Sequence, residues 1–473
     1  MAAIKFGTDG WRGIIAEDFT FENVRKVSQA IADYVKSSTT AGKQPVIIVG
    51  YDNRFLSEEY AKTVSGILSA NDIKVIFTKK SVPTPAVTYY IKEKGLSGGI
   101  VVTASHNPAG FNGIKFKTGN AASAAISVTL KIEKLIPQAS VKAVDFDEAK
   151  DRGLIAVQNI DSDYLGFIKK YIDLNLIKNS GMKLLVDYMY GTGTGYIEEL
   201  LSRGKVKTTV IRNERNPSFG GVNPEPVPKN LEVFLKTAKK QRPDVAIALD
   251  GDADRIAAAD ARGRYLSSGE IISLILLHLL EYRRLKGTVV KTISGTSRIE
   301  KIAADFKLKL LEVPVGFKNI SEIMLHEDVL IGGEESGGIG FKGYIPERDG
   351  IVSGLFLMET SAAEKKPIHK IMSELEKRYG RLYYDRIDLK IPSDKGKASI
   401  EALKEKVPDK LAGKKIADIK DYDGLKFILN DTSWLLLRAS GTEPILRVYA
   451  ESPSRQFLKI LLDTGKRMIF NAA

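Results

Sequence analysis

Short apolar runs, each ending in a polar or glycine-rich loop, alternate with helical stretches over most of this chain. Runs of this kind lie at 46–50, 98–102, 183–187, 245–249 and 330–333. Because such runs indicate buried strands, their alternation with helices predicts mixed or parallel sheets connected by crossover helices. We therefore expect an α/β protein, and 473 residues with 43% hydrophobic content are enough for three or four domains.

The alternation restarts twice and then gives way to a different pattern, which predicts four domains. We expect three α/β domains at residues 1–150, 151–255 and 256–375, and a smaller α+β domain at residues 376–473. The three α/β units suggest repetition of one fold, but their sequences differ too much to establish a repeat. In the last unit, the lysine-rich stretch from Pro392 to Lys420 is interpreted as a solvated helix and loop.

The composition excludes several functional classes. The chain has no cysteine, which excludes disulfides and thiolate metal sites, and its four scattered histidines do not favour zinc. No apolar run reaches the roughly 18 residues of a membrane span, and the N-terminus lacks the pattern of a signal peptide, so we expect a cytoplasmic protein. The net charge of +13 favours anionic ligands. The basic residues are scattered and the aromatic residues show no RNA-binding signature, so no nucleic-acid partner is expected.

The segment Thr103-Ala104-Ser105-His106-Asn107-Pro108 directly follows one of the apolar runs. Its Asn-Pro pair forces a loop, so Ser105 and His106 lie where a strand gives way to a loop, which is where open α/β sheets bind ligands. A serine there can be a nucleophile or a carrier of phosphate. Its hydroxyl needs a base, a metal or a phosphoryl group already attached to it.

The segment Asp250-Gly251-Asp252-Ala253-Asp254-Arg255 follows another apolar run. Three carboxylates at alternate positions could hold Mg²⁺ or Ca²⁺, and Mg²⁺ commonly shares its ligand shell with a phosphate. An EF-hand is excluded because the required glutamate and glycine are misplaced. A solvated acidic turn is the alternative, and it is less favoured because carboxylates beside an apolar strand repel one another unless they are neutralised.

Three further loops carry polar groups of interest. Glu334-Glu335-Ser336-Gly337-Gly338 offers carboxylates and a hydroxyl to vicinal sugar hydroxyls, although it could be a plain turn. Arg438-Ala439-Ser440-Gly441-Thr442-Glu443-Pro444 could cradle a phosphate or form a hairpin turn with a surface arginine. The loop at 7–13, which carries Arg12, is ambiguous by itself. Gly191 to Gly195 is interpreted as a strand-to-helix turn, because no lysine follows as it does in a P-loop.

In this order, the segments containing Arg12, Ser105, Asp250, Glu334 and Arg438 resemble the α-D-phosphohexomutase superfamily. This superfamily includes phosphoglucomutases, phosphomannomutases and phosphoglucosamine mutases. The resemblance spans essentially the whole chain. It implies three related mixed α/β domains and a smaller C-terminal α+β domain around a central cleft. It also implies Mg²⁺ as cofactor, glucose 1,6-bisphosphate as activator, a hexose phosphate as substrate, and a monomer or homodimer.

The resemblance further implies roles for individual residues. Ser105 would be the phosphoserine, and the metal ligands would be Ser105, through a phosphate oxygen, with Asp250, Asp252 and Asp254. Arg12 and Lys115 would assist proton transfer and stabilise charge beside the transferring phosphoryl group, and His106 would neighbour it. Substrate contacts would come from Arg255, Arg348, Glu334 and Ser336, of which the last two would bind O3 and O4 of the sugar. The phosphate that is not reacting would be bound by Arg438, Ser440, Gly441, Thr442 and Arg447.

One departure from the family pattern bears on the substrate. Many phosphomannomutases and phosphoglucosamine mutases have a histidine where this chain has Gly338. We therefore expect a phosphoglucomutase that interconverts glucose 1-phosphate and glucose 6-phosphate. A phosphomannomutase or a bifunctional mutase is the alternative, and a phosphoglucosamine mutase is less favoured. A metal-dependent phosphatase and an inactive sugar-phosphate-binding protein are the rival classes.

Overall fold

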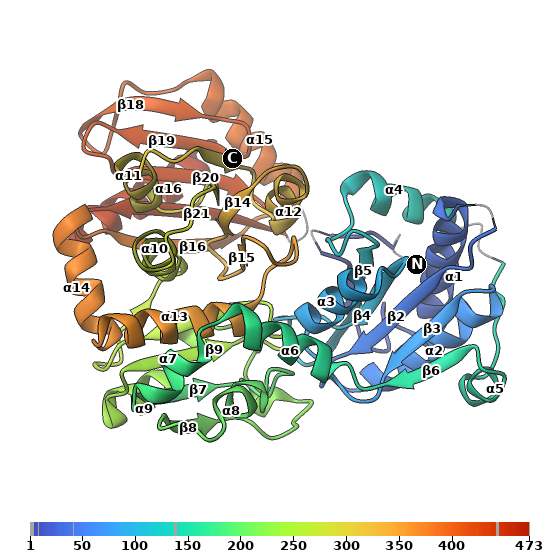
Figure 1. Cartoon of the computed structure of the whole chain (residues 1–473). Helices are drawn as coiled ribbons and strands as arrows, with labels where there is room; N and C mark the ends of the chain where they lie inside the picture. Colours follow the sequence, from blue (N-terminus) through green and yellow to red (C-terminus); the bar gives the residue numbers. More distant parts are fainter. Residues whose placement is uncertain (1–3, 8, 41, 137–139, 441–443, 473) are drawn as a thin grey trace.

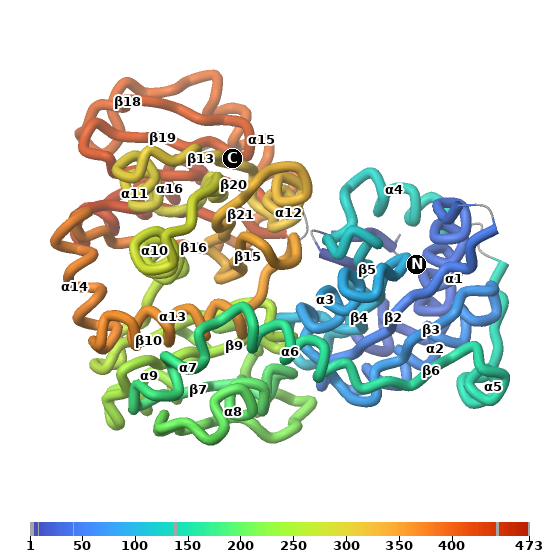
Figure 2. The backbone as a smooth tube through the Cα atoms, in the orientation of Figure 1, coloured from blue at the N-terminus to red at the C-terminus, as the bar shows by residue number. Residues whose placement is uncertain are grey.

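The computed structural model describes residues 4–7, 9–40, 42–136, 140–440 and 444–472. Figure 1 shows four units, with the first on the right and the other three stacked on the left, from the second at the bottom to the fourth at the top. Figure 2 follows the chain from the N-terminus in the first unit to the C-terminus in the fourth. Across the described residues, no helix has the length and apolar character needed to cross a membrane.

The first unit is a six-stranded mixed sheet with helices on both faces. Its strands are β1 (Trp11–Ile14), β2 (Val46–Tyr51), β3 (Lys74–Thr78), β4 (Gly98–Val102), β5 (Phe111–Thr118) and β6 (Ile155–Gln158). Its helices are α1 (Phe21–Ser38), α2 (Ser57–Ala70), α3 (Thr84–Lys94), α4 (Ile126–Leu135) and α5 (Phe146–Asp151). Both faces of β2 and β4 are buried, which explains why these strands are continuous apolar runs.

The second unit is a five-stranded mixed sheet. Its strands are β7 (Lys183–Asp187), β8 (Lys207–Ile211), β9 (Val245–Leu249), β10 (Ile256–Ala259) and β11 (Tyr265–Leu266). Its helices are α6 (Asp161–Tyr171), α7 (Leu174–Asn179), α8 (Tyr196–Leu201) and α9 (Glu232–Gln241), with short 3₁₀ turns at Phe219–Gly221 and Pro228–Asn230.

The third unit has a four-stranded sheet of β12 (Thr288–Thr292), β13 (Leu310–Val313), β14 (Val329–Gly333) and β15 (Ile339–Phe341). Its helices are α10 (Ser268–Leu277), continued by a π-helix at His278–Tyr282, α11 (Ser297–Asp305), α12 (Phe317–His326), α13 (Gly350–Glu364) and α14 (Ile368–Tyr379). Helix α13 is buried over nearly its whole length and packs against α7, β9 and α10, so it joins the second unit to the third.

The fourth unit is a six-stranded antiparallel sheet covered by two helices. Its strands are β16 (Tyr383–Lys390), β17 (Lys410–Leu411), β18 (Lys414–Lys420), β19 (Leu425–Leu429), β20 (Trp434–Ala439) and β21 (Ile445–Ser452). Its helices are α15 (Ser393–Glu405) and α16 (Arg455–Ala472). The α+β prediction for this unit is confirmed.

The first three sheets repeat one topology, which confirms the predicted α/β class and the suggested repeat. In each, a central strand has parallel partners on both sides, and a fourth strand returns antiparallel beside the third. The corresponding orders are β5-β4-β2-β3, β10-β9-β7-β8 and β15-β14-β12-β13. The loop between the third and fourth strands therefore occupies an equivalent place in all three units.

The expected domain limits need correction. Strand β6 lies beyond the limit at residue 150, yet it pairs with β3, so the first sheet extends past that limit. The limit at 255 separates β10 and β11 from the sheet they belong to, and the limit at 375 falls inside α14. The interpretation of Pro392 to Lys420 as helix and loop is right for α15 and wrong for β18, which pairs with β19.

Candidate active site

The equivalent loops of the first three units carry the three central motifs found in the sequence. The β4–β5 loop holds Ser105, the β9–β10 loop holds the three aspartates, and the β14–β15 loop holds Glu334. Two of these loops are joined by an isolated β-bridge between Arg255 and Gly338. A Cβ on Gly251 would lie 2.6 Å from the carbonyl oxygen of Ser105, so glycine permits the close approach of the first and second loops.

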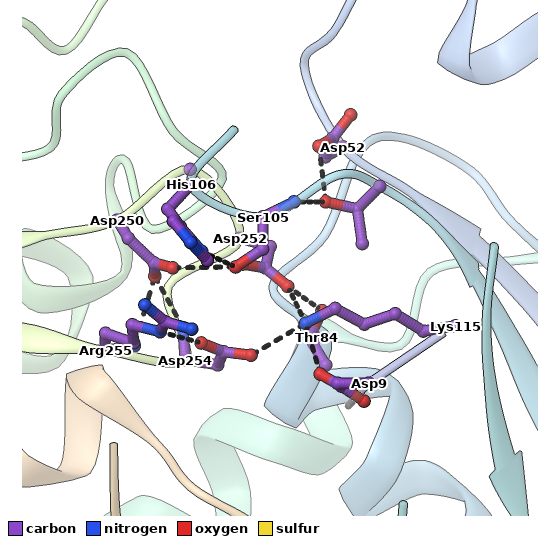
Figure 3. Close-up of polar contacts among 12 residues, drawn as sticks. Asp9, Asp52, Thr84, Ser105, His106, Lys115, Asp250, Asp252, Asp254 and Arg255 are labelled. Atoms are coloured by element: carbon purple, nitrogen blue, oxygen red, sulfur yellow. Dashed lines mark hydrogen bonds and ion pairs between the residues drawn. The ribbon is translucent and has the colours of Figure 1, made fainter. Parts of the chain in front are cut away.

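Ser105 is fully buried and has a left-handed backbone conformation, with φ at 53°. This conformation is strained for a residue with a side chain, and its amide donates to the hydroxyl of Thr103 at 2.8 Å, which helps to hold it. The Ser105 hydroxyl donates to Oδ2 of Asp250 at 3.1 Å and lies 3.4 Å from Nδ1 of His106 (Figure 3). The strained turn therefore aims the hydroxyl at the aspartate loop of the second unit.

Arg54 holds the backbone of the serine loop from inside the protein. Its guanidinium is fully buried and donates to the carbonyl oxygens of Ser105 and Asn107 at 2.7 Å, of Pro108 at 2.8 Å and of Phe111 at 3.1 Å. A planar fork with five N–H donors suits this arrangement, because one side chain can bind four carbonyl groups pointing in different directions.

Asp52 completes this support. It pairs with Arg54 at 3.1 Å and accepts hydrogen bonds from the hydroxyls of Thr103 and Ser57, both at 2.6 Å. Thr103 in turn accepts the Ser105 amide, so one chain of hydrogen bonds runs from the end of β2 to the backbone of Ser105. The sequence analysis did not identify Asp52 or Arg54, although a polar cluster directly after a buried strand is the signal that could have found them.

We expect Arg54→Lys to destabilise the protein and loosen the serine loop while keeping the charge. An ammonium has three donors and cannot reproduce the fork, so buried carbonyl groups lose partners and the free energy of unfolding falls by about 2 kcal/mol. Urea unfolding measures the change. Arg25→Lys on the exposed face of α1 is the matched control and should leave stability unchanged. Equal stability of the two variants would contradict the anchoring role of Arg54.

The three aspartates form a compact, buried set of oxygen atoms. Asp250, Asp252 and Asp254 are fully buried, and one carboxylate oxygen from each lies within 4.8 Å of the others. Oδ1 of Asp250 accepts the amides of Asp254 and Arg255 at 3.0 and 3.1 Å. Within the described part of the chain, Oδ1 of Asp252 and Oδ1 of Asp254 are buried without a hydrogen-bond partner. Such oxygens fit a hard divalent cation, and Mg²⁺ prefers carboxylate ligands of this kind.

The electrostatics of this set also favour a cation. Burial, together with the neighbouring charges of Asp254 and Asp252, raises the pKa of Asp250 well above its usual value. Burial also opposes ionisation of Asp254, but Arg348 and Lys115 outweigh it and lower the pKa of that carboxyl. The cluster thus carries more negative charge than its site can hold without cations nearby.

Lys115 supplies one such cation. Its buried ammonium lies 2.9 Å from Asp9 and 2.8 Å from both Asp252 and Asp254 (Figure 3). Burial acts to lower the pKa of Lys115, but the three carboxylates reverse this effect and raise it above its usual value. Thr84, at the start of α3, donates its hydroxyl to the same Asp252 carboxylate at 2.5 Å. Lys115 therefore stays protonated at neutral pH.

Arg12 and His106 both lie close to the serine loop. Nη1 of Arg12 donates to the side-chain oxygen of Asn107 at 2.5 Å, which places the guanidinium beside the loop. Burial and the nearby charge of Arg255 lower the pKa of Arg12 from its usual value. Burial and the charges of Arg255 and Arg12 hold the pKa of His106 well below its usual range, so the imidazole is neutral at neutral pH.

Arg348 connects the third unit to the other two. Its guanidinium lies 2.7 Å from Asp9, 2.9 Å from Asp254 and 3.5 Å from Glu334. A Cβ at Gly338 would lie 2.5 Å from Cδ of Arg348, so the arginine fills the space that a side chain at 338 would use. The absence of a histidine at 338 therefore has a structural consequence, because it leaves this space to Arg348.

The Glu334 carboxylate faces the site from the third unit. Burial raises the pKa of Glu334 to about 7. The positive charge of Arg348 acts to lower this pKa, and the negative charge of Glu335 acts to raise it. Ser336 lies 3.5 Å from Glu334, and the amide of Gly316 donates to Glu334 at 3.1 Å. Glu334 and Ser336 thus present a carboxylate and a hydroxyl side by side.

The loop between β20 and β21 in the fourth unit is described only in part. Arg438 donates through Nε to Asp423 at 2.8 Å, and Arg447 lies 3.8 Å from Asp388. Ser440 is buried, and its amide donates to the carbonyl of Ile445 at 2.9 Å. The remaining predicted members, Gly441 and Thr442, lie outside the described residues. The hydroxyl of Tyr449 on β21 lies 3.5 Å from Glu335, which links this unit to the Glu334 loop.

Comparison with known proteins identifies the family. Models of the phosphoglucomutase/phosphomannomutase family match the α/β/α domain I at residues 3–142, domain II at 162–263, domain III at 267–379 and the C-terminal domain at 400–463. The chain belongs to this family. Family members are phosphohexomutases, so the protein is an enzyme of the isomerase class that transfers a phosphoryl group within a hexose phosphate.

Individual relatives in the phosphohexomutase family carry different substrate names. A phosphoglucomutase/phosphomannomutase of Thermococcus kodakarensis is 30% identical over 475 residues, covering 99% of this chain and 98% of the relative. A probable phosphoglucosamine mutase of Methanosphaera stadtmanae is 29% identical over 474 residues, covering 98% of each chain. The solved structure of a putative phosphomannomutase from Thermus thermophilus has a TM-score of 0.87, 31% identity and 99% coverage of each chain.

The structure of this phosphohexomutase brings most of the predicted site residues into one contact network. Ser105, His106, Lys115 and the three aspartates meet directly, and Arg255, Arg348 and Glu334 join them from the second and third units. Two residues that the sequence analysis gave no role also belong to the network. Asp9 pairs with Lys115 and Arg348, and the buried Lys117 pairs with Asp9 at 3.0 Å and with Glu347 at 2.5 Å.

Proposed function

We propose that this phosphohexomutase works through a phosphoserine at Ser105 and interconverts glucose 1-phosphate and glucose 6-phosphate. The observation that carries the proposal is the buried Ser105 hydroxyl held 3.1 Å from Asp250, in a cluster whose other two aspartates each keep one oxygen with no hydrogen-bond partner among the described residues. A carrier serine beside an incomplete set of metal ligands suits transfer of a phosphoryl group better than hydrolysis at a bound water.

The proposed reaction has two transfers. In the first, O6 of glucose 1-phosphate attacks the phosphorus on Ser105, the bond from that phosphorus to Oγ breaks, and the O6 proton is passed by neighbouring groups to Oγ, which becomes a hydroxyl again. Glucose 1,6-bisphosphate results and turns over in the site. In the second, Oγ of Ser105 takes the phosphoryl group from O1, and glucose 6-phosphate is released. Glucose 1,6-bisphosphate also acts as activator, because it can phosphorylate an enzyme that has lost its phosphate.

Named residues supply the charge and the proton transfer. Asp250, Asp252 and Asp254 would hold Mg²⁺ together with an oxygen on phosphorylated Ser105, and the bound ion would neutralise charge on the transferring group. Arg12 and Lys115 add further positive charge and assist proton transfer, and the neutral His106 is a nearby proton acceptor. Such preorganised charges stabilise a loose, in-line transition state.

The third unit is proposed to hold the sugar. Glu334 and Ser336 would bind O3 and O4, while Arg255 and Arg348 contact the substrate. Because Glu334 and Ser336 would bind O3 and O4, they can bind the sugar in the same way whether its O1 end or its O6 end faces Ser105. Each phosphate must react in turn, so this property is required of the site.

The fourth unit is proposed to bind the phosphate that is not reacting, through Arg438, Ser440, Gly441, Thr442 and Arg447. We expect Arg438→Ala to raise the KM for the sugar phosphate at least tenfold, because an arginine–phosphate contact contributes roughly 1.5–3 kcal/mol to binding. Phosphorylation of Ser105 by glucose 1,6-bisphosphate should still occur. Steady-state kinetics, with Arg467→Ala on the exposed face of α16 as control, measure the difference. An unchanged KM would remove this loop from the site.

The preference for glucose is supported by Gly338 and by the position of Arg348 over it. Glucose, mannose and glucosamine phosphates differ only at C2, and a site that does not hydrogen-bond the distinguishing group separates analogues by only about 10–200-fold. The test is kcat/KM for the three 1-phosphates, each with its own bisphosphate. We expect glucose to lead, and equal rates with mannose would indicate a bifunctional mutase.

Phosphoglucosamine mutase is the second candidate. It is favoured by the name of the Methanosphaera stadtmanae relative, which matches this chain over nearly its full length. A higher kcat/KM for glucosamine 1-phosphate than for glucose 1-phosphate in the same comparison would establish it and overturn the preference for glucose.

A further inference from the structure

A basic hollow lies outside the site described above, where the second, third and fourth units meet. It consists of two adjoining cavities of about 330 and 450 Å³, which share Arg262 and His369 as lining residues. The β10–β11 loop lines it from the second unit, the first turns of α14 from the third, and Tyr383 and Arg455 from the fourth. Figure 1 shows α14 running along the outer left side of the molecule beside these units.

Positive charge in the basic hollow exceeds what its own carboxylates neutralise. Asp260 pairs with Arg264 at 3.3 Å, and Glu376 pairs with Arg381 at 2.6 Å. Four further cations line the two cavities, and no ion pair is found for any of them among the described residues: Lys239, Arg242, Arg262 and Arg455. Asp244 is the remaining carboxylate, and its Oδ2 accepts the amide of Lys183. The hollow therefore favours an anion.

A second observation concerns His369, which lines both cavities. Nδ1 of His369 is buried and has no hydrogen-bond partner within the part of the chain that the structure describes. His369 lies in the first turn of α14, a helix of 12 residues, so the positive end of the helix dipole faces the same region. A buried ring nitrogen without a partner is costly unless a ligand or water satisfies it.

We propose that the basic hollow is a second anion site, which binds the phosphate group of a small metabolite away from the catalytic loops. Arginine is suited to this task because its planar fork matches phosphate oxygens. The site goes beyond the mutase activity proposed above. Residues 380–382, which connect α14 to β16, include Arg381 and Leu382 in the wall of the hollow, so a bound anion would contact the segment that positions the fourth unit.

The test uses inorganic phosphate as the probe, against chloride at matched ionic strength. Hydrogen exchange of the full-length protein, followed by mass spectrometry, should show protection of the β10–β11 loop and the start of α14 as phosphate is added. In the double variant Arg262→Gln/Arg455→Gln, the phosphate concentration for half-maximal protection should rise at least tenfold. Arg467→Gln, on the exposed face of α16, is the matched control and should behave as the wild type.

The double variant changes no residue that we place in the catalytic machinery, so its turnover without added phosphate should equal that of the wild type and report an intact fold. Protection confined to the serine and aspartate loops would mean that phosphate binds only at the catalytic site, and this would overturn the second site. Equal protection by chloride, or protection that persists in the double variant, would also overturn it. None of these results bears on phosphorylation of Ser105, so the two proposals fail separately.

Discussion

Ser105→Ala is expected to reduce mutase turnover by about a thousandfold or more, because an alanine can neither carry nor return the phosphoryl group. The fold should remain intact. The Ser105 side chain forms hydrogen-bond contacts with Asp250 and His106, while its backbone is held by Arg54 and Thr103, which the substitution leaves unchanged. Intact-mass measurement after incubation with glucose 1,6-bisphosphate should show added phosphate on the wild type and none on the variant.

Ser65→Ala is the matched control for this experiment. Ser65 is also fully buried, and its hydroxyl donates a hydrogen bond to the carbonyl of Ala61 within α2. A serine that bonds back to its own helix contributes little to stability, so this variant should keep normal turnover and normal phosphate uptake. If Ser105→Ala retained turnover close to that of Ser65→Ala, the phosphoserine mechanism would be wrong.

The sequence predicted the parts of the fold that are buried on both faces. Central strands such as β4 and β9 are continuous apolar runs because helices cover both faces of a mainly parallel sheet. Strands at or near a sheet edge gave no such signal. In the edge strand β6 only Ile155 is buried. Strand β18 is flanked on its outer side by the two-residue β17, and it mixes lysine and aspartate with apolar residues over a largely exposed stretch. Charged edge strands limit aggregation, and for that reason they are easily interpreted as loops.

The residues of the candidate site were also predicted only in part from the sequence. Ser105 and the three aspartates were found because each motif follows a strand end, and the repeated topology then brings these ends together. Lys117 and Asp9 were not given roles, because a single charged residue has no spacing pattern and the partners of these two residues are distant in the sequence. Arg348 and Asp9 are 339 positions apart, and Lys117 and Glu347 are 230 apart. Only the packing of the first unit against the third reveals these pairs.

Asp252→Asn is expected to slow phosphoryl transfer by on the order of a hundredfold or more and to weaken Mg²⁺ dependence. The reason is that Asp252 is a proposed ligand of the Mg²⁺ ion whose charge stabilises the transition state. The variant keeps the shape of the side chain. Its free Oδ1 is the atom offered to the cation, while Oδ2 accepts from Lys115 and Thr84. The amide removes the negative charge and leaves at most one acceptor oxygen to serve the cation, Lys115 and Thr84. Binding of Mn²⁺, followed by electron paramagnetic resonance, should weaken in parallel with activity.

Asp187→Asn separates a metal role from a merely structural one. Asp187 is a buried aspartate at the end of β7 in the same unit, and it pairs with Arg212. Replacing it should lower the free energy of unfolding, because a buried arginine loses its charged partner, but it should leave the Mg²⁺ concentration for half-maximal activity unchanged. Asp252→Asn should instead show a large change in metal dependence. Wild-type activity that survives exhaustive chelation, or an Asp252→Asn enzyme with normal metal dependence, would contradict the proposed role of the aspartate cluster in binding a catalytic cation.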